Sequence, residues 1–180
     1  MPRHGVVIVD GVSLSHIDPA DVRRDIGLMG QGSSLFHGTI RENLMLGAPL
    51  ATDEDLNKAL NITGAAEFIR RLPTGLDHML AEGGIGLSGG QRQSLLLARV
   101  LIRNPYILLL DEPTAALDDV TEKHLLNGLN TWVADKTMVV ATHKMSIVNM
   151  VDRIIVIDHG QIVLDEQKDV ALAKLSGQIK

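Results

Sequence analysis

The chain has 180 residues, of which 45% are hydrophobic, and this length and composition suit one globular domain with a sizeable core. Its formal net charge of -5 argues against a protein that binds nucleic acid through a basic surface, so we expect no nucleic-acid partner. The sequence has no cysteine, which excludes disulfide bonds and thiolate metal sites. No apolar run reaches the roughly 18 residues that span a bilayer, so we expect any membrane part in another segment or another chain.

Apolar patterns separated by turn residues predict a mixed α/β chain. The Asp10-Gly11 pair is a hairpin signal, and Asp18 followed by Pro19 is typical of a helix start. A polar-interrupted helical pattern covers residues 39–71. The expected strands cover residues 5–10, 12–14, 26–29, 107–110, 137–142, 154–158 and 161–164, and further helices are expected at 19–24, 119–133, 145–151 and 166–175.

Residues 87–119 (LSGGQRQSLLLARVLIRNPYILLLDEPTAALDD) predict a turn, a helix, a buried strand and an acidic strand end. Ser88 is placed to cap the helix, and Gln91 follows three residues later to complete a capping box. Gly89 and Gly90 leave the backbone N–H groups of the first turn uncovered. A helix start of this kind is an anion site, and phosphate is its usual anion.

Two carboxylates close the apolar strand expected at 107–110. Asp111 and Glu112 follow that strand directly, and Pro113 ends it because proline has no N–H for the strand ladder. Open α/β sheets bind their ligands at the carboxyl ends of parallel strands. We therefore expect a ligand site at this edge of the sheet.

The motif LSGGQRQ, followed along the chain by ILLLDEPTAALD, resembles the nucleotide-binding domain of ABC (ATP-binding cassette) transporters. The stretch LFHGTIRENL after Gln31 and the histidine His143 after the strand at 137–142 match the same family. The resemblance implies an α/β fold of the P-loop NTPase-like (RecA-like) class, with a parallel-sheet core, an inserted α-helical subdomain and a truncated amino terminus. The implied partial domain spans residues 1–180, with the helical subdomain at approximately 37–103 and the core at 1–36 and 104–180.

The resemblance implies ATP and Mg²⁺ as cofactors and assigns catalytic roles to three residues. Glu112 would polarise the attacking water as general base, His143 would contact the γ-phosphate, and Gln31 would sense the magnesium ion and the water. Asp111 would hold the metal through water, with Gln31 as a second metal contact. A loop glutamine or a lone histidine is more often structural, so these roles depend on the family context.

The same resemblance implies that nucleotide is bound between two such domains arranged head to tail. Ser88, Gly89, Gly90 and Gln91 would then cap the γ-phosphate held by the opposite subunit. Asp118 would contact that partner. The implied partners are a second nucleotide-binding domain and the transmembrane domain of an exporter.

No GxxxxGK[ST] sequence occurs among the 180 residues. In the family this P-loop, called Walker A, lies upstream and holds the β- and γ-phosphates. We therefore expect the chain alone to be inactive. We also expect it to be poorly stable, because an absent central strand would leave its neighbours unpaired.

Two other interpretations compete with a hydrolysing ATPase. The first is a truncated, non-hydrolysing subunit that supplies only its signature residues, Ser88, Gly89 and Gly90, to a partner's ATP site. The second is a dinucleotide fold, since residues 84–89 satisfy GxGxxG and Asp111 follows at a strand end. No buried strand leads into those glycines, and the fingerprint explains neither Gln31 nor His143, so we reject it.

Four stretches give a finer resemblance, to the ATPase domains of type I secretion systems: DGVSLSHIDPADVRRDIG, LFHGTIRENLMLGAP, ATDEDL and VDRIIVIDHGQIVLDEQKDV. Those systems export proteins from Gram-negative bacteria. This implies further contact with membrane fusion and outer-membrane duct proteins through the full transporter. It places the chain at the cytoplasmic face of the bacterial inner membrane.

Overall fold

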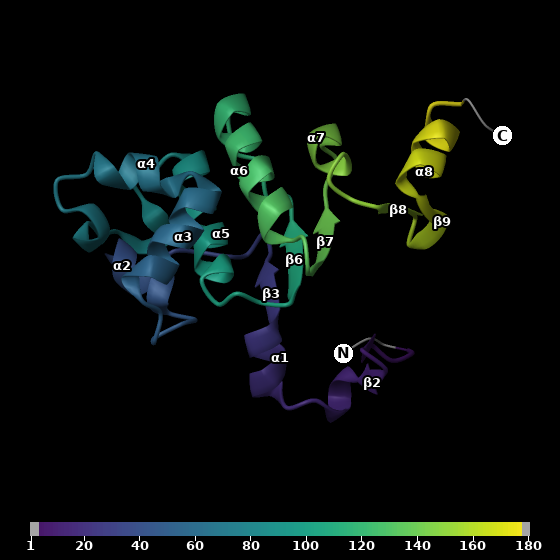
Figure 1. The fold of residues 1–180 in the computed structure, drawn as a ribbon, viewed down its shortest axis with the longest axis horizontal. Coiled ribbons are helices and arrows are strands. Elements are labelled where there is room, and N and C mark those ends of the chain that lie inside the picture. Colours follow the sequence, from purple (N-terminus) through teal and green to yellow (C-terminus); the bar gives the residue numbers. More distant parts are fainter. Residues whose placement is uncertain (1–3, 178–180) are drawn as a thin grey trace. The chain divides into compact units, whose positions relative to one another are not determined.

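The protein is described here by a computed structural model that covers residues 4–177. The chain contains both helices and strands (Figure 1). The helices are α1 (Pro19–Asp25), α2 (Ile40–Met45), α3 (Asp53–Thr63), α4 (Ala65–Arg70), α5 (Gly89–Leu101), α6 (Asp119–Trp132), α7 (Met145–Val148) and α8 (Lys168–Leu175). The strands are β1 (Ile8–Val9), β2 (Val12–Ser13), β3 (Ile26–Met29), β4 (Gly38–Thr39), β5 (Met79–Leu80), β6 (Ile107–Asp111), β7 (Thr137–Ala141), β8 (Arg153–Asp158) and β9 (Gln161–Gln167).

The chain divides into two compact units, one ending at Ala141 and the other beginning at Thr142. The subdomain boundaries predicted from the sequence, at residues 37, 103 and 104, remain a prediction. Across residues 4–177, no helix combines the length and the apolar character that crossing a membrane requires.

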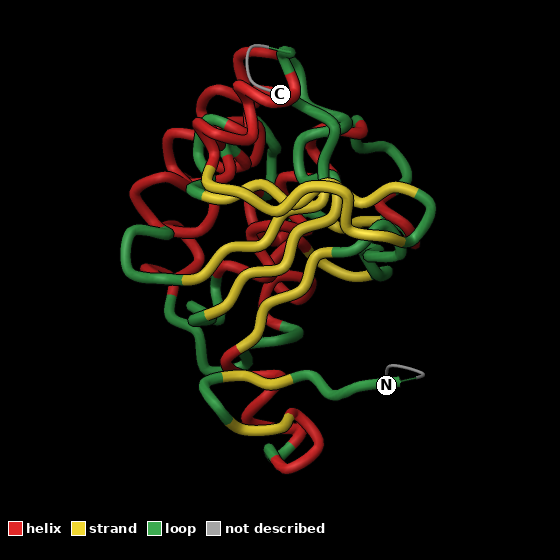
Figure 2. The backbone as a smooth tube through the Cα atoms, turned by 90° about the vertical axis from the view of Figure 1, so that its right-hand side faces the viewer, coloured by secondary structure: helices red, strands yellow, loops and turns green. Residues whose placement is uncertain are grey.

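The first unit is built on a parallel sheet with the strand order β3–β6–β7. Figure 2 shows its strands running side by side, with the short β1–β2 hairpin set apart from them. β6 is the central strand, and its residues Leu108 and Leu110 are buried, as expected for a parallel sheet covered by helices. β6 pairs on both sides, with β3 and with β7, and within residues 4–177 both β3 and β7 pair in this sheet on one side only. The expectation that an absent central strand leaves its neighbours unpaired stays a prediction.

The helices α2 to α5 lie between β3 and β6 in the chain, and capping boxes begin three of them. Thr39 with Glu42 starts α2, and Thr52 with Asp55 starts α3. Each cap satisfies two backbone N–H groups that the helix itself leaves unpaired. α3 packs against α5 and α6, and its Leu56 is fully buried. These helices thereby hold the start of α5 in a defined place.

The amino-terminal hairpin is shorter than predicted. Only Ile8–Val9 and Val12–Ser13 pair, because a 3₁₀ turn at Leu14–His16 ends the second strand at once. The turn itself is confirmed, since Asp10 and Gly11 both have positive φ angles, of 48° and 80°. This is the backbone that two-residue hairpin turns require.

The second unit is a β8–β9 hairpin followed by α8. The hairpin is longer than predicted, since β9 continues to Gln167, which pairs with Arg153. Arg153 also donates to the Asp165 carboxylate across the two strands, at 2.6 Å, and this cross-strand pair favours the extra length. The final helix accordingly begins at Lys168 instead of residue 166.

Gly27 provides a test of the packing of β3. A Cβ atom at this position would lie 2.7 Å from Pro105 Cγ and 2.7 Å from Val100 Cγ1. We predict that Gly27→Ala lowers the free energy of unfolding by about 1–3 kcal/mol through overpacking, measured by urea denaturation of the chain. The matched control is Gly30→Ala, which meets nothing within 4 Å and should stay within about 0.5 kcal/mol. Equal effects of the two changes would contradict this packing.

Candidate active site

The strand register brings three of the predicted residues to one edge of the sheet. β3 and β6 pair Met29 with Leu110, and β6 and β7 pair Asp111 with Ala141. Because the strands are parallel, Gln31, which follows β3, lies at the same edge as Asp111 and its neighbour Glu112. This is the carboxyl edge, where α/β sheets bind ligands.

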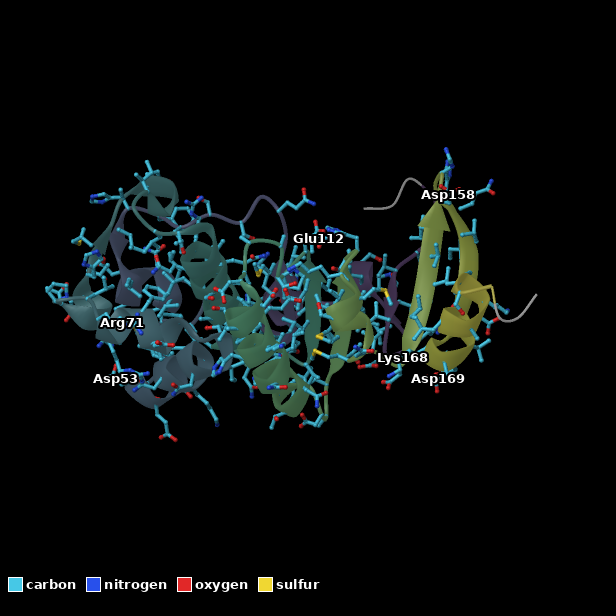
Figure 3. All side chains as sticks on the ribbon, turned by 90° about the horizontal axis from the view of Figure 1, so that it is seen from above. Asp53, Arg71, Glu112, Asp158, Lys168 and Asp169 are labelled. Atoms are coloured by element: carbon cyan, nitrogen blue, oxygen red, sulfur yellow. The ribbon has the colours of Figure 1, made fainter. Side chains whose placement is uncertain are left out.

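Glu112 has an unusual backbone at this edge (Figure 3). Its φ angle is 48°, a left-handed conformation that costs a non-glycine residue roughly 1–2 kcal/mol. Its N–H donates to the carbonyl oxygen of Ala141 at the end of β7, at 2.9 Å. The side chain is half-buried, so the carboxylate remains within reach of a ligand at the sheet edge.

The start of α5 has the predicted capping box. The Ser88 hydroxyl accepts from the Gln91 N–H at 3.1 Å, and the Ser88 N–H donates to Gln91 Oε1 at 3.0 Å. Within residues 4–177, the N–H groups of Gly89 and Gly90 meet no acceptor. Two unsatisfied donors at the positive end of a 13-residue helix fit a phosphate group.

The glycines at this helix start lie directly against the segment that follows Glu112. A Cβ atom on Gly90 would lie 3.1 Å from the Ala116 carbonyl oxygen, and one on Gly89 would lie 3.2 Å from Ala116 Cβ. A larger residue at either position would crowd Ala116. Glycine at both positions permits this close packing and leaves the N–H groups uncovered.

One contact at this junction was missed by the sequence analysis. Gln93 Nε2 donates to the carbonyl oxygen of Glu112 at 2.6 Å, and Gln93 Oε1 accepts from the Ala116 N–H at 2.8 Å. The sequence did contain a signal for this contact. Gln93 precedes Leu97 by one helical turn, and Leu97 is fully buried, so Gln93 lies on the same face of the helix. A polar residue on the buried face of a helix requires a hydrogen-bonding partner.

Asp118 is the N-cap of α6. Its carboxylate accepts from the Thr121 N–H at 3.0 Å, the Thr121 hydroxyl at 2.8 Å and the Val120 N–H at 3.1 Å. These hydrogen bonds, those from Thr121 first, lower the pKa of Asp118.

A hollow of about 280 Å³ lies between this cap and the start of α5. It is lined by Gly64, Glu67, Phe68, Arg71, Ser88, Gly90, Gln91, Ser94, Asp118 and Thr121. The structure thus brings Asp118 together with Ser88, Gly90 and Gln91 at the start of α5.

The two other predicted residues lie in loops. Gln31 is exposed in a turn that the Ser33 N–H closes on the Gly30 carbonyl oxygen at 3.0 Å. His143 is exposed and lies near the start of the second unit, two residues after Ala141 in the sequence. Across residues 4–177, no cluster of three or more His, Asp or Glu side chains could hold a metal ion unaided.

Comparisons with known proteins point to one family. The family model described as ABC transporter matches residues 1–115. A multidrug export ATP-binding/permease protein of Staphylococcus aureus strain NCTC 8325 is 40% identical over 159 residues, which are 88% of this chain and 28% of that protein. Its counterpart in the bovine strain RF122 is 39% identical over 159 residues.

A solved structure agrees with these sequence matches. A bacterial Atm1-family ABC exporter with ATP bound aligns with a TM-score of 0.90 and 33% identity, covering 98% of this chain and 31% of that one. The chain therefore spans less than a third of the length of the proteins it matches. The predicted P-loop NTPase-like fold class is confirmed. The chain belongs to the ABC transporter family, as a nucleotide-binding domain of its exporters.

Proposed function

We propose that the chain is an ATP-binding and ATP-hydrolysing part of an ABC exporter. The observation that carries this proposal is the junction between two candidate ligand sites. Gly89 and Gly90, whose N–H groups meet no acceptor within the described residues, pack against Ala116 in the segment that follows Glu112. A phosphate-binding helix start and a carboxylate at the carboxyl edge of a sheet are the parts that nucleotide hydrolysis requires.

The residues at the sheet edge suit the family's ligand, ATP with Mg²⁺, which supplies the phosphoryl group for hydrolysis. Mg²⁺ is usually held by one or two carboxylates together with waters and phosphate oxygens. The Asp111 carboxylate and the Gln31 amide would therefore be enough protein ligands for the ion. The Glu112 carboxylate would accept a proton from the attacking water. The imidazole of His143 would donate a hydrogen bond to the γ-phosphate.

The proposed assembly is a head-to-tail pair of nucleotide-binding domains attached to a transmembrane domain. The hollow between Ser88 and Asp118 is the surface that would face the second domain. The transmembrane partner is supported by the relatives, which are ATP-binding/permease proteins, and by the matched exporter structure. The chain would then work at the cytoplasmic face of the membrane.

Two kinds of cargo are supported by different observations. The names of the staphylococcal relatives favour small drug-like molecules. The stretches that resemble type I secretion ATPases favour protein cargo, with membrane fusion and outer-membrane duct proteins as further partners. Stimulation of ATP hydrolysis by small amphipathic compounds would support the first cargo, and loss of a secreted protein on deletion of the gene would support the second.

Glu112→Gln tests the general base. In a transporter that contains this chain, we predict that ATP still binds but that turnover falls by about 10²–10⁴-fold, because the amide cannot accept the proton. Steady-state phosphate release and nucleotide binding measure the two quantities. The control Glu54→Gln, in the exposed first turn of α3, should leave both unchanged. Unchanged hydrolysis in Glu112→Gln would instead favour the non-hydrolysing subunit.

Ser88→Arg tests the role of the α5 start across the interface. The larger, charged side chain breaks the capping box and blocks the approach of a second domain, so hydrolysis should fall at least about 100-fold. ATP binding by a separate nucleotide-binding domain that includes the P-loop should be unaffected. Ser176→Arg, after the last helix, is the matched control and should retain wild-type hydrolysis. An active Ser88→Arg transporter would remove this residue from the site.

Calorimetry with ATP and Mg²⁺ tests the 180-residue chain alone. We predict no measurable binding, since the chain contains no P-loop to cradle the β- and γ-phosphates. A P-loop supplied by protein outside these residues should restore binding. Micromolar affinity of the chain itself would show that it has another phosphate cradle and would contradict the proposed division of the site.

A further inference from the structure

Gln93 uses both ends of its side-chain amide on one short segment, the post-strand segment (residues 112–117). Its Nε2 donates to the Glu112 carbonyl oxygen and its Oε1 accepts from the Ala116 N–H, at 2.6 Å and 2.8 Å. The side-chain amide offers a donor and an acceptor in one plane for both groups. The hydrogen bond to Glu112 is part-buried, so water competes less strongly for it than for the exposed hydrogen bond to Ala116.

The backbone of Glu112 is therefore held from both sides. Its N–H bonds to Ala141 on β7, and its carbonyl oxygen accepts from Gln93 and, at 3.3 Å, from the Ala115 N–H. These contacts keep the residue in its left-handed conformation, with φ at 48°. Left-handed backbone persists in a non-glycine residue only where its surroundings over-determine it. Since the Cα–Cβ direction follows the backbone, the same contacts set the direction in which the Glu112 side chain leaves the backbone.

The other end of the post-strand segment lies against the start of α5. The close approach of Gly89 and Gly90 to Ala116 leaves no room for the helix start to move toward the segment without displacing it. Gln93 lies on the first turns of the same helix, so helix and segment are joined by packing and by two hydrogen bonds.

We propose that Gln93 is a positioning residue that holds the carboxylate of Glu112 in its working direction and connects it to the phosphate-binding start of α5. The inference rests on the proposed function. In a head-to-tail pair, the α5 start and Glu112 of one chain serve two different nucleotides. Gln93 then links the two sites, because a shift of α5 on binding one nucleotide moves the backbone of the base at the other.

Three substitutions separate positioning from packing. Gln93→Met keeps the length and volume of the side chain and removes both hydrogen bonds. Gln93→Glu keeps the acceptor for the Ala116 N–H but places a carboxylate oxygen against the Glu112 carbonyl oxygen. The control is Gln161→Met, in β9, where the exposed glutamine side chain makes no hydrogen bond within the described part of the chain.

Amide hydrogen exchange in the 180-residue chain tests the contact itself, independently of nucleotide. Gln93→Met should speed exchange of the Ala116 N–H about tenfold, while Gln161→Met should not change it. Urea denaturation checks that the variants remain folded. Equal Ala116 exchange in wild type and Gln93→Met would overturn the proposal.

Hydrolysis by a complete transporter tests the positioning. Gln93→Met should lower kcat about 10–100-fold with KM for ATP changed by less than about threefold, and should reduce cooperativity between the two sites. Gln93→Glu should be equally impaired at pH 8 and recover relative to wild type toward pH 6, since a protonated carboxyl again offers one donor and one acceptor. Gln93→Met should show no such recovery.

A folded Gln93→Met transporter with wild-type kcat and cooperativity would overturn the proposal. So would a Gln93→Glu variant whose activity relative to wild type does not depend on pH. A wild-type transporter without any ATP turnover would contradict the proposed function instead. In that case the exchange of the Ala116 N–H would still decide whether Gln93 holds the post-strand segment.

Discussion

The close contact between the start of α5 and the segment after β6 is the constraint on which the site depends. Gly89 and Gly90 allow the two backbones to approach, and the amide of Gln93 joins them by two hydrogen bonds. A Cβ atom at Gly90 would lie 3.1 Å from the Ala116 carbonyl oxygen and would crowd this contact. The same two glycines keep the N–H groups at the helix start open for an anion. Glycine at these two positions thus serves both the packing of the helix start and the binding of an anion.

The rest of the first unit holds the two partners of this contact in place. β6 is central in the parallel sheet and delivers Asp111 and Glu112 to its carboxyl edge. α3 packs against both α5 and α6, so it supports the capped start of α5 on one side of the hollow and the Asp118 cap on the other. The exporter family supplies the context in which these parts act on ATP.

Local signals predicted most of the elements and the caps. The capping box of Ser88, the strand that ends in Asp111 and the turn at Asp10 all depend on neighbours a few residues away, and all are confirmed. The hairpin bounds in the second unit were wrong, because the pairing of Gln167 with Arg153 extends β9. Within the described residues β7 is an edge strand of the parallel sheet, and the expectation that an absent central strand leaves its neighbours unpaired stays a prediction.

By itself, the sequence determined the family, the fold class and the chemistry of the candidate residues. Motifs, helix caps and strand-end carboxylates can be recognised in short stretches of sequence, because they depend on a spacing of one to four residues. Only the tertiary structure decided that Gln93 reaches Glu112 and Ala116, positions 19 and 23 residues away in the chain. It also decided the left-handed backbone of Glu112, which no propensity favours and which contacts from β7 and α5 maintain. Contacts at such distances depend on the packing of whole helices against the sheet, which short stretches of sequence do not encode.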